Sequence, residues 1–204
     1  MDIINLRNID MLFFLFLRRC HYYFVVFNLK THVIDILDNM ERVGHIIDVY
    51  DFDIHIMREM VVQHLRNIGH PSADLMEPVE DRIMEIKWRT RNNYTDCGVF
   101  CMRHMETYMG GGSRGWYTGF TTEEPSQKKQ IENLRIKYCT KILLSDQNIC
   151  KKLVEEEVAQ FYSLSPTAQL KKKTHADVTR KYRLNSERRH ECWIVWRINT
   201  IAFS

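Results

Sequence analysis

Residues 21 to 38 read HYYFVVFNLKTHVIDILD, and this stretch decides the fold that the sequence predicts. Two runs rich in aromatic and β-branched residues, 22–27 and 33–37, flank the short connection 28–31. Such runs favour β-strands, and a short connection between two of them favours an antiparallel hairpin. The sequence therefore predicts two neighbouring strands here.

The register of this hairpin decides which side chains face one another. With residues 29 and 30 at the centre of the turn, the numbers of opposed residues sum to 59, and His21 lies opposite Asp38. Directly opposed residues project from one face with Cβ atoms about 5 Å apart, so the carboxylate can hold one nitrogen of the imidazole. A loop with one residue more would turn the partner to the other face. The alternative is a surface histidine and an aspartate in a turn.

The rest of the chain has the pattern of an α+β protein. The continuous apolar run 11–17 favours a strand covered on both faces, and the alternation of apolar and charged residues over 84–88 favours a fourth strand. Helices are expected where apolar residues recur at helical spacing: 54–68, 97–108, 131–142 and 149–161.

The composition is that of a globular protein. Of its 204 residues, 45% are hydrophobic and 27% charged, and the net charge of +3 is too small to indicate nucleic acid or a membrane as a partner. No segment approaches the roughly 20 apolar residues of a membrane span. Six cysteines without CxxC pairs and without a secretory leader predict reduced thiols in an intracellular protein, nuclear or cytoplasmic.

A cysteine stands where a helix is expected to begin. Asp96 is a good N-cap residue, so Cys97 falls in the first helical turn. The free amides and the macrodipole of that turn favour a thiolate and can donate to an oxyanion. Gly98 lets a substrate backbone come close because it has no Cβ. The alternative is a buried structural cysteine.

The same helix offers a rival set of residues. Cys97, Cys101 and His104 lie at positions i, i+4 and i+7 and could share a face that binds zinc. A structural zinc site needs four ligands, and no fourth lies nearby in the sequence. We therefore expect no metal and no cofactor.

The order and spacing of three motifs resembles the ubiquitin-like-protease family, which deconjugates SUMO, and most of all its divergent plant-type copies. The motifs are HYY at 21–23, VIDILDN at 33–39 and DCGVF at 96–100, and the segments 102–108 and 134–138 extend the likeness. The resemblance covers roughly residues 10 to 160. It implies a papain-like α+β fold, with a mixed or antiparallel sheet packed against a central helix that starts at the catalytic cysteine.

The resemblance also implies a function. It implies a thiol peptidase that cleaves after the Gly-Gly terminus of a SUMO-like modifier, with the modifier and its conjugates as partners and a monomeric state. Cys97 corresponds to the nucleophile, His21 to the general base and Asp38 to the residue that orients the base. Asp35 competes with Asp38, but the family spacing and the hairpin register both favour Asp38.

The chain departs from the family pattern near the expected site. Arg91 stands six residues before Cys97, where the family has its oxyanion glutamine, so Arg91, Asn92 or Asn93 is expected to replace that donor. Tyr22 stands where the family has the tryptophan that helps to clamp the Gly-Gly tail, a task expected of Tyr22 with Gly98.

The chain also has less sequence at its start than the family domain. Only 20 residues precede His21, and the family has substrate-binding residues there. We expect an N-terminally incomplete catalytic domain over 1–165 and a basic, poorly patterned tail over 166–204. An alternative to the peptidase is a catalytically impaired remnant that binds a modifier. Residues 171–189 hold eight Lys or Arg against two acidic residues, but such runs are usually solvated, so nucleic acid is an unlikely partner.

Overall fold

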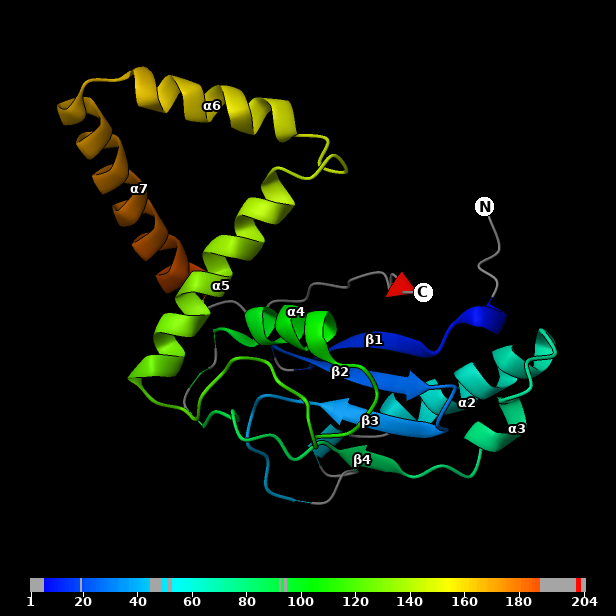
Figure 1. The fold of residues 1–204 in the computed structure, drawn as a ribbon. Coiled ribbons are helices and arrows are strands. Elements are labelled where there is room, and N and C mark those ends of the chain that lie inside the picture. Colours follow the sequence, from blue (N-terminus) through cyan, green and yellow to red (C-terminus); the bar gives the residue numbers. More distant parts are fainter. Residues whose placement is uncertain are drawn as a thin grey trace. The chain divides into compact units, whose positions relative to one another are not determined.

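The computed structural model describes residues 6–18, 20–44, 49–50, 53–91, 93, 95–187 and 201–202. It has an α+β fold around a mixed five-stranded sheet of order β4-β3-β2-β1-β5, in which only β4 runs parallel to its neighbour (Figure 1). The strands are β1 Met11–Arg18, β2 His21–Asn28, β3 Val33–Leu37, β4 Asp81–Ile83 and β5 Ile201–Ala202. The first three confirm the strands expected from the sequence.

The four expected helices are present, and the one expected over 131–142 begins earlier, at residue 125. The helical elements are the 3-10 turn η1 Leu6–Asn8 and the α-helices α2 Asp53–Asn67, α3 Ala73–Met76, α4 Cys97–Thr107, α5 Pro125–Leu143, α6 Lys151–Ser163 and α7 Pro166–Glu187. Helix α2 ends before Gly69, whose φ of +63° suits a glycine after a helix. Helix α4 starts at Cys97, as the sequence predicts.

Two layers cover the two faces of the sheet because successive side chains of a strand point to opposite faces. Val25 and Phe27 of β2 belong to the apolar cluster that includes Leu65 of α2. On the other face, the rings of Phe13 and Phe24 meet edge to face at 5.7 Å, and Phe13 also contacts Tyr108 just after α4. Helices α2 and α4 thus lie on opposite sides of the sheet (Figure 1).

The register of the β2–β3 hairpin differs from the expected one by two residues. Asn28 pairs with Val33, so the numbers of opposed residues sum to 61 and the loop has four residues. The cause is local: the side-chain oxygen of Asn28 accepts hydrogen bonds from the amides of Lys30 and Thr31, and His32 closes the loop with a φ of +53°. An asparagine side chain that mimics a backbone turn lengthens the loop in this way.

Two further expectations about strands are wrong. Residues 84–88 show the expected alternation, with Met84, Ile86 and Trp88 buried, but they form no strand. The ladder on β3 ends at Ile83, and the chain then keeps only single contacts with the end of the sheet, such as Met84 N to Ile36 O at 3.0 Å. Strand β1 is not covered on both faces, since Leu15 is 50% exposed.

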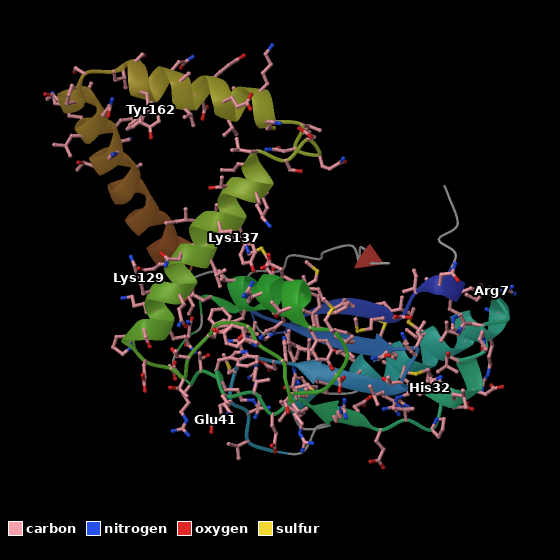
Figure 2. All side chains as sticks on the ribbon, viewed as in Figure 1. Arg7, His32, Glu41, Lys129, Lys137 and Tyr162 are labelled. Carbon is pink, nitrogen blue, oxygen red and sulfur yellow. The ribbon has the colours of Figure 1, made fainter. Side chains whose placement is uncertain are left out.

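The chain divides into two compact units, residues 1–134 with 198–204, and residues 135–197. The expected domain boundary at residue 165 falls within the second unit, in the turn between α6 and α7. Helix α6 buries none of its residues, and Figure 2 shows its exposed Tyr162. The described part of the segment after residue 165 forms the helix α7.

Among the described residues, no helix combines the length and the apolar character needed to cross a membrane. The cysteines described there, Cys20, Cys97, Cys101, Cys139 and Cys150, are free thiols.

Candidate active site

The site begins with a histidine and an aspartate at the end of the sheet. Nε2 of His21, the first residue of β2, lies 2.6 Å from Oδ1 of Asp38, which directly follows β3. His21 is 5% exposed and Asp38 is fully buried. The expected contact is therefore present, although the register on which it was predicted is not.

The contact is present despite the wrong register because the register error is an even number of residues. In the observed register Asp38 falls opposite Tyr23, and His21 becomes its diagonal neighbour on the same face. A shift by one residue would have turned Asp38 to the other face, whereas a shift by two keeps the face. Diagonal neighbours lie close enough for long side chains to meet. The predicted pair therefore depended on an even loop length, and not on the particular turn.

Four donors hold the carboxylate of Asp38. Oδ1 accepts from His21 and from the amide of Met40 at 2.8 Å, and Oδ2 accepts from Arg42 Nε at 3.2 Å and the Tyr50 hydroxyl at 3.0 Å. Burial disfavours the ionised carboxylate, but His21, the Met40 amide and Arg42 outweigh burial and hold its pKa below the usual range. Asp38 is thus a fixed anion.

Cys97 approaches this pair from the start of α4. Cys97 is buried, at 6% exposure, and its thiol interacts with the His21 ring and with the backbone amides of Tyr22 and Gly98. Asp96 occupies the N-cap position as expected, but its side chain makes no capping hydrogen bond and instead accepts from Asn93 at 2.9 Å. The amide of Gly98 in the first turn is thereby left to meet the sulfur.

The thiol and the imidazole shift each other's pKa. Burial disfavours protonation of His21, but Asp38 and Cys97 outweigh it and raise the pKa of the ring to about 9. Burial likewise disfavours a thiolate, but His21 and the amides of Tyr22 and Gly98 lower the pKa of Cys97 below its usual value. These opposite shifts favour a thiolate–imidazolium pair, the reactive form of a thiol nucleophile.

The orientation of the ring assigns a role to each nitrogen. Asp38 holds Nε2, so Nδ1 is the nitrogen left for the sulfur. Nδ1 is buried, and it makes no hydrogen bond with any described residue. A proton on Nδ1 can therefore pass to or from groups that bind at Cys97.

The side chains expected to replace the oxyanion glutamine are engaged with other groups. Arg91 pairs with Glu41 on the loop after β3, and its own amide donates to Glu123 at 2.7 Å. The amide nitrogen of Asn93 donates to Asp96, and its oxygen accepts from the backbone of the same turn. Asn92 lies outside the described residues. Backbone amides beside Cys97 are the donors that the described geometry offers.

The two residues expected to clamp a substrate tail flank the sulfur. The backbone amide of Tyr22 reaches Cys97, and its side chain is half-buried. Around Gly98, no heavy atom lies within 4 Å of the place where a Cβ would be. The backbone at Gly98, the residue after Cys97, therefore has open space on the side where a Cβ would point.

The competing residues from the sequence have other partners. Asp35 is buried and binds Arg82 and the hydroxyl of Tyr108, a structural contact on the α4 side of the sheet. Nε2 of His104, the third member of the possible zinc set, accepts a hydrogen bond from Trp88 at 2.9 Å. Complete burial lowers the pKa of His104 to about 3, so the ring is neutral. Among the described residues, no group of three or more His, Cys, Asp or Glu side chains could hold a metal ion.

Sequence reasoning missed Tyr50 and Arg42, the two donors to Oδ2 of Asp38. Arg42 follows Asp38 by four residues, a spacing that could have drawn attention to it. Tyr50 follows a segment without a clear pattern, so no signal pointed to it.

Two surface clefts lie away from the thiol. One, of about 790 Å³, runs along α2, and the other, of about 740 Å³, lies beside Glu41 and Arg91. Cys97 lines neither cleft. Comparisons of the chain with family models, with curated proteins and with solved structures found no match.

Proposed function

We propose that the chain is a papain-like cysteine peptidase that hydrolyses the Gly-Gly terminus of a SUMO-like or other ubiquitin-like modifier. The observation that carries the proposal is Cys97 beside an imidazole that the buried Asp38 holds at 2.6 Å, with pKa shifts that favour a thiolate and an imidazolium. The motif order in the sequence supports the substrate class.

The first half of the reaction forms a thioester. The Cys97 thiolate attacks the carbonyl carbon of the terminal glycine, and a sulfur–carbon bond forms. The negative charge on the carbonyl oxygen is met by backbone amides at the start of α4. The carbon–nitrogen bond then breaks, and Nδ1 of His21 gives its proton to the leaving amine.

The second half releases the modifier. Nδ1 of His21 takes a proton from water, and the oxygen of that water attacks the thioester carbon. The carbon–sulfur bond breaks, and Cys97 leaves as the thiolate while the ring keeps the proton that it took from water. Asp38 keeps Nε2 occupied throughout, so Nδ1 carries every proton transfer.

The test measures cleavage of a substrate that carries a SUMO tail joined to a fluorescent amine. Cys97→Ala abolishes cleavage, whereas Cys101→Ala, which removes a buried thiol one turn further along α4, retains it. A Cys97→Ala chain that cleaves as fast as the parent chain would refute the proposal.

One observation favours the second candidate, a catalytically impaired remnant that only binds a modifier. Arg91 stands where the family places its oxyanion donor, and its guanidinium is committed to Glu41. The loss of one oxyanion donor costs about 10²–10³ in rate. A SUMO-tail probe with an electrophilic end separates the two: prompt labelling of Cys97 excludes the remnant, and saturable binding of the modifier without labelling supports it.

A further inference from the structure

We infer that Tyr50 is a positioning residue of this site, which together with Arg42 fixes the carboxylate of Asp38 and so sets the reactivity of Cys97. The inference rests on the proposed triad and concerns a residue outside it. Tyr50 is 1% exposed and cannot touch a substrate, so any effect on Cys97 passes through Asp38.

The hydrogen bonds around Asp38 form a complete set. A carboxylate offers about four lone-pair directions, and each oxygen of Asp38 meets two donors. His21 and Met40 share Oδ1, and Tyr50 and Arg42 share Oδ2. If Oδ2 lost its donors, the carboxylate could turn about its Cβ–Cγ bond and present Nε2 of His21 with a different geometry. Tyr50 and Arg42 prevent this rotation.

Tyr50 suits this task better than Arg42 does. Burial, together with Asp38, raises the pKa of Tyr50, so its hydroxyl stays protonated and donates at every pH at which the protein is folded. Its ring packs against that of Tyr23, with centroids 5.0 Å apart. The side chain of Arg42 is 31% exposed and shares its charge with solvent.

Other titratable groups surround Asp38 and stay in place when Tyr50 is changed. Those that interact with Asp38 or Tyr50 come from β2, from the loop after β3, from the segment before α4 and from α4: His21, Tyr23, Arg42, Arg89, Cys101 and His104. The change Tyr50→Phe removes one O–H donor and no charge.

Tyr23 provides a matched control. It is also 1% exposed and lies against Tyr50, but its buried hydroxyl makes no hydrogen bond with any described residue. Tyr50→Phe and Tyr23→Phe therefore delete the same atom from neighbouring rings, and only the first deletion removes a donor to Asp38.

The experiment measures the rate at which iodoacetamide alkylates Cys97 in the full chain between about pH 4 and pH 9, with the modified peptide identified by mass spectrometry. Loss of a donor to a buried carboxylate favours its protonated form. On the acidic side of the profile, the alkylation rate of Cys97 rises with pH, and we call this rise the acid edge. In Tyr50→Phe the acid edge moves to higher pH, so that the rate at a given pH on it falls about three- to ten-fold. The Tyr23→Phe profile coincides with that of the parent chain.

Arg42→Gln removes the other donor to Oδ2 at a partly exposed position and moves the acid edge in the same direction, which keeps the inference testable if Tyr50→Phe does not fold. A Tyr50→Phe or Arg42→Gln profile that coincides with the parent profile overturns the inference, as does an equal shift in Tyr23→Phe. Alkylation requires no peptidase activity. If the parent chain cleaves no modifier while the edge still shifts, the proposed function fails and the role of Tyr50 stands.

Discussion

Cys97 and Cys101 lie one helical turn apart on α4, yet their thiols have opposite electrostatic surroundings. Burial disfavours a thiolate at both positions. At Cys97 the His21 ring and two amides outweigh burial and lower the pKa, whereas at Cys101 burial, together with the Cys97 charge, raises the pKa well above its usual value. At the scale of the residue, reactivity depends on partners and not on residue type.

This contrast predicts selective alkylation. A short exposure to iodoacetamide at about pH 6, where ordinary thiols are protonated, should modify Cys97 and leave Cys101 intact. The exposed Cys20 serves as the internal reference for accessibility to the reagent. Peptide mapping checks the result, and modification of Cys20 ahead of Cys97 would contradict the lowered pKa.

Asp38 should stabilise the fold in a limited range of pH. Its pKa is lowered in the folded state, so its contribution is present above its unfolded pKa of about 4 and is lost as the pH falls through the folded value. The pKa of His21 is raised from 6.5 to about 9, so its contribution is complete below 6.5 and is lost as the pH rises through about 9. The pair therefore contributes most to stability between about pH 4 and pH 6.5.

Asp38→Asn should lower the free energy of unfolding by about 2–4 kcal/mol near pH 6, because it breaks a buried charge pair. The deficit should narrow toward pH 3 and again above about pH 9. Urea unfolding at the three pH values measures it. Asp74→Asn is the control, since Asp74 pairs with Arg66 at 2.9 Å but is 83% exposed, and its loss should change stability little. A deficit that does not vary with pH would argue against the ionised pair.

At the scale of the element, the start of α4 combines a helix with an approach for a substrate. Gly98 is the second residue of the helix, where glycine is unfavourable, and the space beside it is open. The fold therefore does not require a glycine at position 98. Under the proposed function, the glycine is there because it gives a substrate access to Cys97.

Gly98→Ala should therefore separate stability from activity. The change should raise the free energy of unfolding by about 0.5–1 kcal/mol, because alanine is the better helix former. It should slow cleavage of a SUMO-tail substrate about ten-fold, because the methyl group occupies the path of the substrate backbone. Thermal unfolding and kcat/KM test both halves, and unchanged cleavage would remove Gly98 from the site.

Gly110→Ala is the matched control for this prediction. Gly110 has a φ of +78°, and a Cβ there would collide with the side chain of Asn28. It should destabilise the fold by about 1–3 kcal/mol, the opposite of the effect at Gly98.

At the scale of the whole molecule, the apolar core and the candidate site both lie in the first unit. Every member of the main apolar cluster comes from residues 6 to 76. The first half of α5 belongs to this unit, where Gln127 is buried and donates to the carbonyls of Trp88 and Thr121. Helix α6 buries nothing, so it adds little hydrophobic stabilisation.

A chain that ends at residue 144 should therefore fold. It loses α6, α7 and the two-residue strand β5, and should keep a cooperative thermal transition within about 4 °C of the parent chain. Its Cys97 alkylation profile should be unchanged. A second chain that ends at residue 165 should gain no stability over the first. If only the longer chain unfolds cooperatively, the boundary expected from the sequence is the better one.

The sequence by itself determined the elements and the identity of the central pair. A continuous apolar run indicated β1, runs rich in aromatic and β-branched residues indicated β2 and β3, helical spacing indicated α2, and Asp96 as an N-cap placed Cys97 at the start of α4. The pair His21–Asp38 followed from parity, which a two-residue error in the turn did not disturb. These features are local, because each depends on residues that lie close together along the chain.

Only the tertiary structure decided what completes the site. Tyr50 reaches Asp38 from 12 residues away and Arg91 reaches Glu41 from 50 residues away, and no periodicity encodes either contact. The apolar residues of 84–88 are buried without a strand, and those of α6 remain exposed although they follow a helical pattern. A pattern along the chain specifies which face of an element is apolar, but the partner of that face depends on how distant segments pack.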